Sequence, residues 1–347
     1  KYDDIMTIDT NHKQFSSEPS IVLGDPEEDL PLEMFIAMDQ PKHTKQRKVA
    51  SPVVAPPNLA KLEPLIRQRV QFILDGLPIG EDFNWVQHVS VELTTMMLAT
   101  LFDFPFEERQ KLTRWSDVAT AEPGAGLIET EEERQMELIG CLEYFNGLWA
   151  ERANKPPSGE MDLISMLAHG ESTKNMEPME FLGNLILLIV GGNDTTRNSI
   201  SGGVWALNQF PDEYQKLRDN PSLIPNMSSE IIRWQTPLAY MRRTALEDVE
   251  YGGKTIKAGD KVLMWYVSGN RDPDKFENAN ELVIDRPDAR RHMSFGFGIH
   301  RCMGNRLAEL QLRILWEEIQ QRFHKIDSGS RCPPHAKRSP HEAQNCF

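Results

Sequence analysis

Residues 294–304, with the sequence SFGFGIHRCMG, bring one cysteine, one histidine and three glycines into a short loop directly before a predicted helix. The free backbone N–H groups of a helix's first turn point toward Cys302, and with the positive end of the helix dipole they stabilise a thiolate. Glycines permit positive φ angles and let the backbone approach a flat ligand closely. The loop therefore indicates a metal-bound thiolate, although a lone cysteine is more often a small buried apolar residue.

A second set of residues with chemical potential lies in a long apolar stretch, in the segment VGGNDTT at 190–196. Helical spacing places several of them on or near one face: Leu187, Val190, Gly191, Asp194 and Thr195. A glycine costs about 1 kcal/mol relative to alanine inside a helix. The adjacent glycines thus indicate either space kept for a ligand or tight packing against another helix, and the spacing favours neither reading.

Charged pairs at helical spacing occur at two further places. Glu230 and Arg233 are three residues apart in SSEIIRW and can form a bidentate pair on one helical face. His43 and Arg47 are four residues apart at a predicted helix start, where they can hold carboxylates that need cationic partners. Either pair can instead be part of a solvated charged surface. Around His43 and Arg47 this surface would also include Lys42, Lys45 and Lys48.

The cysteine loop resembles the FxxGxHxCxG haem-binding signature of the cytochrome P-450 monooxygenases at every defining position: Phe295, Gly298, His300, Cys302 and Gly304. The resemblance implies that Cys302 is the proximal ligand of the haem iron and that Phe295 packs beside the sulfur. In such a site, backbone N–H donors to the sulfur tune how strongly the thiolate pushes electrons toward the iron.

The other segments resemble further motifs of this family. The GGxDT match at 191–195 implies that Thr195 orients bound dioxygen and that Asp194 helps to relay protons, because cleavage of an O–O bond consumes two of them. The ExxR match, together with Arg286 in IDR, implies a structural network of Glu230, Arg233 and Arg286 that supports the haem-binding core.

Cationic partners for the two haem propionates follow from the same resemblance. The HxxxR match implies that His43 and Arg47 bind them. His300 from the loop and Arg243 from an RxA match complete the set, and the neighbouring Arg242 leaves open which arginine reaches the propionate.

Apolar residues at three- and four-residue spacing predict the helices that must position these groups, over 58–77, 86–101, 131–154, 180–210 and 304–323. At 1.5 Å per residue, the fourth of these is about 45 Å long and crosses an entire domain. β-Branched and aromatic residues around Gly252-Gly253, including the run 262–267, predict a small sheet region. We therefore expect one α+β domain with helices dominant, the cytochrome P-450 fold, over residues 1–323, beginning with a B helix over 1–15.

Charge and hydropathy exclude several classes of protein. Thirty-eight Lys and Arg residues against 52 Asp and Glu residues give a net charge of −14, so the mean field repels nucleic acid. The longest apolar stretch, 185–190, is far shorter than the roughly 20 residues that span a bilayer. The start of the chain lacks a secretory pattern, and the four cysteines form no CxxC pair, so we expect a cytoplasmic protein. The segment from Cys332 to His335 lacks the ligand quartet of a zinc site.

Two strings, LPLEMFIAMD at 30–39 and GGNDTTRNS at 191–199, resemble the bacterial alkane terminal hydroxylases of this superfamily. The resemblance implies a soluble bacterial enzyme that oxidises the terminal carbon of medium-chain alkanes, related alcohols or fatty acids. A methionine-rich apolar pocket without charges suits such a substrate, although a stripe of this kind is as often plain core. The candidate substrate contacts are Met34, Phe35, Leu187, Val190 and Leu238.

Electrons must come from other proteins, because the chain has no flavin fingerprint and no cysteine set for an iron–sulfur cluster. The resemblance implies haem b (iron protoporphyrin IX), dioxygen as co-substrate, and NAD(P)H electrons that a ferredoxin reductase and a ferredoxin deliver to a monomeric enzyme. A basic patch is expected to dock the acidic ferredoxin, made of Lys42, Lys45, Arg47, Lys48 and Arg301.

Alternatives and departures accompany this interpretation. The chain can instead be a P-450 hydroxylase of another apolar substrate, a haem protein without turnover, or a hydrolase with Cys302 as nucleophile and His300 as base, although such close positions rarely face each other. The A helix and first strands that precede the family's B helix are missing. Residues 324–347 carry Pro, Ser and His where the family has a strand pair, so we expect an atypical tail, from a shifted reading frame or a fragment, and weak folding or haem binding.

Overall fold

The computed structural model describes residues 1–25, 32–156 and 161–329. The helices are α1 (Tyr2–Thr10), α2 (Lys42–Ala50), α3 (Pro56–Asp75), α4 (Glu92–Phe102), α5 (Gln110–Thr120), α6 (Glu131–Ala153), α7 (Leu163–His169), α8 (Pro178–Gln209), α9 (Pro211–Asp219), α10 (Ile224–Gln235), α11 (Tyr266–Gly269) and α12 (Asn305–Arg322). The strands are β1 (Phe15–Ser16), β2 (Met241–Ala245), β3 (Val249–Tyr251), β4 (Lys254–Ile256) and β5 (Lys261–Met264). Helices dominate, so the predicted α+β class is confirmed.

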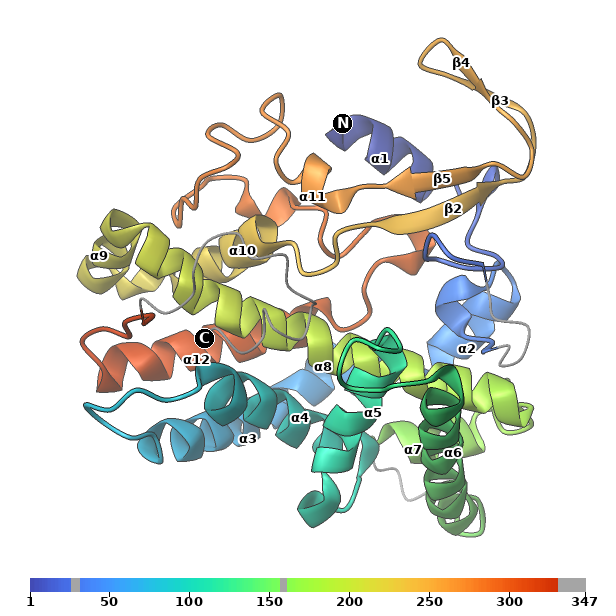
Figure 1. Cartoon of the computed structure of the whole chain (residues 1–347), viewed down its shortest axis with the longest axis horizontal. Coiled ribbons are helices and arrows are strands. Elements are labelled where there is room, and N and C mark those ends of the chain that lie inside the picture. The colour runs from blue at the N-terminus through green and yellow to red at the C-terminus, as the bar shows by residue number, and fades with distance from the viewer. Residues whose placement is uncertain (26–31, 157–160, 330–347) are drawn as a thin grey trace.

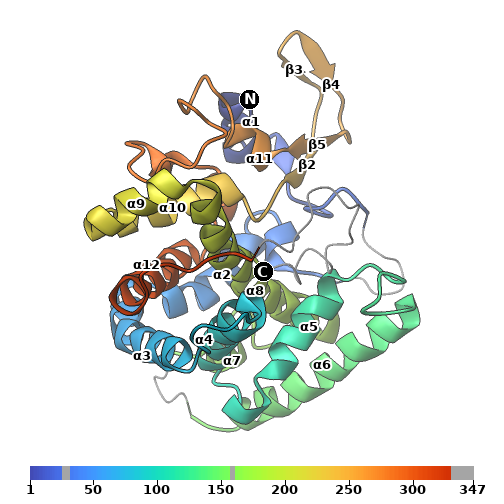
Figure 2. The same ribbon diagram turned by 60° about the vertical axis from the view of Figure 1, so that its left-hand side comes forward.

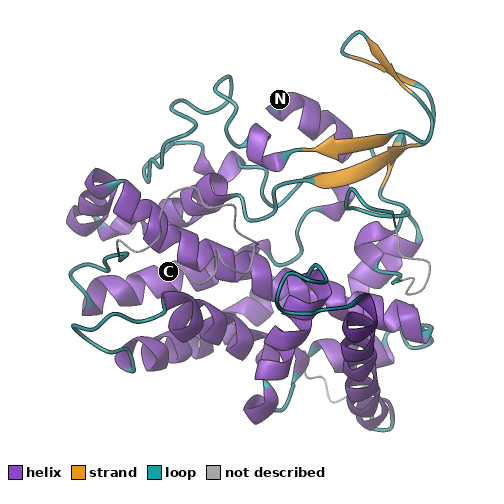
Figure 3. Ribbon diagram, in the orientation of Figure 1, coloured by secondary structure: helices purple, strands orange, loops and turns teal. Residues whose placement is uncertain are grey.

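Most of the helices form one body, and the strands lie above it together with α1 and α11 (Figure 1 and Figure 3). In the turned view, α8 passes through the middle of the helical body, between α3 and α12 on one side and α5 and α6 on the other (Figure 2). Strands β1, β2 and β5 form an antiparallel sheet in that order, in which Arg243 pairs with Val262. Strands β3 and β4 form a separate hairpin.

Helix α8 is long because its sequence has a continuous apolar face and clear limits. Pro178 stands in its first turn, where a missing N–H costs nothing, and Pro211 stands two positions after its last residue, Gln209. Leu182, Leu185 and Ile189 have no exposed surface and pack in the larger of two core clusters. The helix therefore carries residues 191–195 rigidly through the interior.

The sheet region differs from the sequence prediction at its end. The run 262–267, which belongs to the predicted sheet region, is only partly strand, because β5 ends at Met264 and residues 266–269 form the short helix α11. Leaving the strand lets the Tyr266 ring enter the second core cluster, where it is 1% exposed, beside Tyr2 and Phe276. The first helix also ends earlier than expected, at Thr10, and Phe15 pairs with Ala245 instead.

Part of the expected tail is described. The Ile326 carbonyl accepts from the Asn208 side chain of α8, and the Ile326 N–H donates to the Tyr214 hydroxyl of α9. The first residues of the tail therefore pack against the helical body. Residues 330–347, with Cys332, His335 and Cys346, lie outside the described residues. Cys141 is fully buried in the larger core cluster. Within the described ranges, none of the helices is long and apolar enough to cross a membrane.

Candidate functional site

Backbone hydrogen bonds shape the loop over 294–304 that presents Cys302. The Cys302 N–H donates to the Phe295 carbonyl at 2.7 Å, and residues 298–300 form one turn of 3₁₀ helix. Gly298 has a φ of +65°, and a Cβ there would lie 2.7 Å from the carbonyl oxygen of Asp9. The close approach that requires glycine at this position is to the end of α1, whereas the sequence suggested approach to a flat ligand.

The Cys302 thiol lies deep in the protein and still has open surface. Burial raises its pKa, but the backbone N–H groups of Gly304 and Asn305 bond toward the sulfur and act to lower it, as do the charges of Arg47 and Arg301. The side chain nevertheless keeps accessible surface. Depth and accessibility together mean that Cys302 borders an internal space, with the N–H donors of the α12 start directed at its sulfur as the sequence predicts. Phe295 lies half-buried in the same loop, with its ring 5.0 Å from that of His292.

Two histidines with unfilled ring nitrogens meet beside this loop. His43 of α2 and His300 have ring centroids 4.1 Å apart, and neither ring has a hydrogen-bond partner among the described residues. Burial lowers the pKa of His43 to about 4, helped by the Arg47 charge. Burial likewise lowers the pKa of His300 to about 2, with smaller contributions from His43 and Arg243. Both rings are therefore neutral near pH 7 and each offers one N–H donor.

The three arginines near these histidines have different partners. Arg47 donates to the Arg301 carbonyl and lies near the Cys302 thiol, whose charge it affects. Arg243 is 2% exposed, and its Nη2 donates to the Asp9 carboxylate at 2.7 Å. Arg242 turns away and donates through Nη1 to the Gly24 carbonyl and to the Asp25 carboxylate, at 3.1 and 3.0 Å. Arg243, rather than Arg242, thus faces the histidine pair.

On α8, the predicted proton-relay residues have defined partners. The Thr195 hydroxyl donates to the Gly191 carbonyl at 3.2 Å. Asp194 accepts from Arg197 at 2.5 Å, and the same guanidinium donates to Asp117 of α5 at 2.9 Å. Sequence reasoning missed Arg197, although its position three residues after Asp194 was a usable signal.

The adjacent glycines of α8 have different surroundings. A Cβ on Gly191 would meet no atom within 4 Å, and this residue is exposed although it lies in the middle of the central helix. A Cβ on Gly192 would lie 2.8 Å from Cδ2 of Leu98 in α4. Both explanations from the sequence therefore apply, open space at Gly191 and helix packing at Gly192.

The structure brings the three residues of the predicted structural network together. Glu230 and Arg233 of α10 are fully buried and form a bidentate pair at 2.7 and 2.8 Å. Arg286 Nε lies 3.1 Å from both Glu230 carboxylate oxygens. Arg233 also donates to the Asn270 and Ala279 carbonyls, so this network ties α10 to the loop before the cysteine segment.

The candidate substrate contacts divide into two groups. Phe35 is buried, its N–H donates to Asn184 of α8 at 2.9 Å, and its ring lies 6.5 Å from that of His43. Met34 is half-buried beside it, and Leu187 and Val190 are half-buried next to the open face at Gly191. Leu238 instead packs against the second core cluster, so the structure does not place it in the same apolar cluster as Val190.

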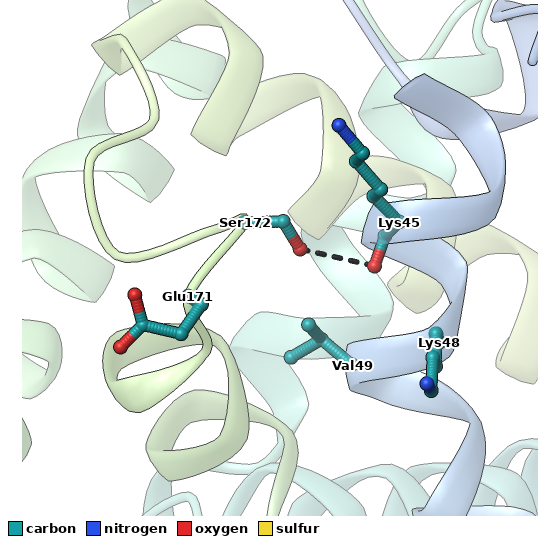
Figure 4. Close-up of a pocket in the computed structure, with 5 residues that line it drawn as sticks. All are labelled: Lys45, Lys48, Val49, Glu171 and Ser172. Atoms are coloured by element: carbon teal, nitrogen blue, oxygen red, sulfur yellow. Dashed lines mark hydrogen bonds between the residues drawn. The ribbon is translucent and has the colours of Figure 1, made fainter. Parts of the chain in front are cut away.

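The basic patch expected on α2 is smaller than the sequence suggested. Lys42 pairs with Glu33 and Glu180, both at 2.8 Å, and Arg47 is turned inward. Lys45 and Lys48 remain exposed and line an open hollow with Val49, Glu171 and Ser172 (Figure 4). The Ser172 hydroxyl donates to the Lys45 carbonyl at 3.0 Å, which joins α2 to the segment after α7.

A largely helical fold with an accessible cysteine just before a long helix is typical of a haem-thiolate monooxygenase. A sequence profile of the cytochrome P-450 family matches residues 141–340. The chain belongs to the cytochrome P-450 family. It is similar to the solved structure of CYP153D17 from Sphingomonas sp. PAMC 26605, with 50% identity and a TM-score of 0.85 over 93% of this chain and 81% of that one.

Curated relatives support the same family. A linalool 8-monooxygenase of Pseudomonas putida is 37% identical over 86% of this chain and 72% of its own length. A methyl-branched lipid omega-hydroxylase of Mycobacterium bovis is 30% identical over 94% of this chain and 77% of its own length. The family implies a monooxygenase with haem and dioxygen, a small-molecule substrate and electrons from redox partners.

The residues present fit a haem. Its iron needs a thiolate, and Cys302 is accessible with N–H donors at its sulfur. Its two carboxylates need donors, and His43 and His300 have ring nitrogens without partners, beside Arg243. The Cys302 thiol and the His300 ring share no hydrogen bond in the described part of the chain, which leaves the hydrolase alternative without its nucleophile–base contact.

Proposed function

We propose that Cys302 would bind the iron of a b-type haem and that the enzyme hydroxylates the terminal carbon of medium-chain alkanes, related alcohols or fatty acids. The observation that carries the proposal is the 50% identity to CYP153D17 over 93% of the chain. The resemblance of the strings at 30–39 and 191–199 to the bacterial alkane hydroxylases points the same way. Residues 1–323 act as one domain in this proposal.

The haem, when bound, supplies the site at which dioxygen is activated for insertion of one oxygen atom. The N–H groups of Gly304 and Asn305 bond toward the Cys302 sulfur and act to lower its pKa against the effect of burial, so they would stabilise a thiolate bound to iron. His43, His300 and Arg243 would donate to the propionates, and the buried triad of Glu230, Arg233 and Arg286 stiffens the structure behind the loop.

In this proposal α8 supplies the protons that oxygen activation consumes. The Thr195 hydroxyl donates to the Gly191 carbonyl, next to the open space at Gly191, and would pass protons on from there. Asp194 lies one residue away and is held by Arg197 and Asn198, so it must turn from the guanidinium to carry a proton. The hydrogen bond from Arg197 therefore fixes where the Asp194 carboxylate lies.

The uncharged side chains on α8 and in the segment before α2 support an apolar substrate. Met34, Phe35, Leu187 and Val190 carry no charge, and Phe35 is anchored to α8 through its backbone. They bind a chain by apolar contact and exclude water. The relatives named for linalool and for methyl-branched lipids favour a second candidate, hydroxylation of another apolar molecule by the same site.

Electrons come from NAD(P)H through a ferredoxin reductase and a ferredoxin to a monomeric, cytoplasmic enzyme. Lys45 and Lys48 are the exposed cations of α2 that attract an acidic ferredoxin, because Lys42 is already neutralised by two glutamates. Arg301 is exposed beside Cys302 and belongs to the same proposed patch, while Arg47 donates to the Arg301 carbonyl. Both charges also act to lower the pKa of Cys302.

Two measurements test the proposal. The reduced carbon monoxide spectrum of the haem-loaded protein should show thiolate ligation, which Cys302→Ser abolishes and the core variant Cys141→Ala keeps. Product analysis with ferredoxin, reductase and NADH should give 1-octanol from octane. A thiolate spectrum without terminal oxidation across an alkane chain-length series would leave the haem site standing and overturn the substrate.

A further inference from the structure

Asp9 is a buried acid for which the site described above has no role. It is the penultimate residue of α1 and is 3% exposed. Three donors from three different elements meet at its carboxylate: Arg243 of β2 at 2.7 Å, the Phe297 N–H of the cysteine loop at 2.7 Å, and the Tyr266 hydroxyl of α11 at 3.1 Å. Burial raises the pKa of Asp9, while Arg243, the Phe297 N–H and the Tyr266 hydroxyl act to lower it, so these donors stabilise the buried carboxylate.

The cysteine loop is shaped to accept this acid. Gly296 has a φ of +60°, and a Cβ there would lie 3.2 Å from both the Asp9 carboxylate and the Tyr266 hydroxyl. Gly298 leaves room for the Asp9 carbonyl in the same way. Burial and the Asp9 charge keep the pKa of Tyr266 well above its usual value, so its hydroxyl stays protonated and donates.

Asp9 holds the arginine that faces the histidine pair. The charge of Arg243 acts on the rings of both His43 and His300. Its hydrogen bonds to Asp9 and to the Arg242 carbonyl use two of its five N–H groups, one on each terminal nitrogen. The guanidinium is thus fixed on one side and keeps donors for a further carboxylate.

We propose that Asp9 is a positioning residue that fixes the Arg243 guanidinium for a haem propionate and offsets part of its positive charge. This inference rests on the haem site of the proposed function. Without Asp9, the Arg243 guanidinium would no longer be held in place for the propionate. The loss of the buried negative charge would also make the ferric state less favourable.

Asp9→Asn keeps the size of the side chain and removes its charge. In the haem-loaded enzyme we expect haem transfer to apomyoglobin to become about tenfold faster, the size of effect expected for one charge-assisted hydrogen bond. The reduction potential should move to a more positive value. Asp9→Glu keeps the charge and should keep the wild-type potential. Tyr266→Phe removes a neutral donor to the same carboxylate; it should change the haem-transfer rate by no more than about twofold and leave the reduction potential close to that of the wild type.

A double-mutant cycle separates positioning from a general structural role. If Asp9 acts through Arg243, Asp9→Asn adds little to the haem loss already caused by Arg243→Gln. Should Asp9→Asn fail to fold, the cycle is run with Asp9→Ser, which also removes the charge. Additive haem loss, or an unchanged potential in Asp9→Asn, overturns this inference. A wild-type protein without thiolate-bound haem would instead refute the proposed function, so the two failures are distinct.

Discussion

Replacing Gly191 by alanine is expected to stabilise the fold and to impair ligand binding at the same time. A Cβ at this position would meet no atom within 4 Å, so the methyl costs no packing. Alanine in a helix interior gains roughly 0.5–1 kcal/mol over glycine. The methyl nevertheless projects into the open space beside Thr195, where the proposed function puts ligands.

Gly192→Ala is the matched control, because it makes the same change one residue along the same helix. Here the methyl would lie 2.8 Å from Leu98 Cδ2, and Leu98 is itself 1% exposed. Overpacking of this kind costs roughly 1–3 kcal/mol, which more than offsets the helical gain. The free energies of unfolding of the two variants should therefore differ by about 1–3 kcal/mol, with Gly191→Ala the more stable.

Urea unfolding of the haem-free proteins, followed by circular dichroism, measures this difference through the midpoint at constant m-value. Substrate titration of the haem-loaded proteins, followed by the change in the haem spectrum, should give weaker binding for Gly191→Ala and nearly unchanged binding for Gly192→Ala. Equal stability of the two variants, or a Gly191→Ala protein less stable than wild type, would refute the assignment of open space at Gly191.

Three further predictions address the buried charges and the surface. Glu230→Gln leaves two buried arginines without their carboxylate and should lower the free energy of unfolding by about 3–5 kcal/mol in urea titrations; a loss below about 1 kcal/mol would mean that the triad is not buried as described. Burial lowers the pKa of His292 to about 3, below its unfolded value of 6.5. Below pH 6.5 only the unfolded chain binds the proton, so the contribution of His292 to the free energy of unfolding is complete above pH 6.5 and is lost as the pH falls toward 3. Between pH 7 and pH 5 the wild type should therefore lose about 2 kcal/mol more than His292→Asn, and parallel pH curves for the two proteins would contradict this. Replacing Lys45 and Lys48 together by glutamine should slow reduction by ferredoxin several-fold and flatten its salt dependence in stopped-flow measurements, whereas Lys42→Gln, whose charge is already paired, should change little; equal effects would rule out the assignment.

Local spacing was a good guide wherever the interacting residues are near neighbours on one helix. The bidentate contact of Glu230 with Arg233 follows from their separation by three residues, because a helix brings such side chains onto one face. The limits of α8 were predicted to within two residues, since an apolar face and flanking prolines are strong signals.

Short apolar runs were a weaker guide. Residues 262–267 are typical of a strand, yet Tyr266 and Val267 begin α11. The Tyr266 hydroxyl donates to Asp9, a partner 257 positions away along the chain, and its ring shares a core cluster with Tyr2 from the same distant helix. A propensity computed over a few residues contains no information about such partners.

The sequence by itself determined the family-like cysteine loop, the dominance of helices and the residues able to bind iron and carboxylates, because these depend on residue type and on short-range spacing. Only the tertiary structure decided that Gly191 faces open space while Gly192 packs on Leu98, and that Arg243 rather than Arg242 turns toward the histidines. It alone brought Asp9 to Arg243, across 234 positions of the chain. Such choices are set by which distant elements pack together, since the direction and partner of a buried charge follow from the whole folded environment.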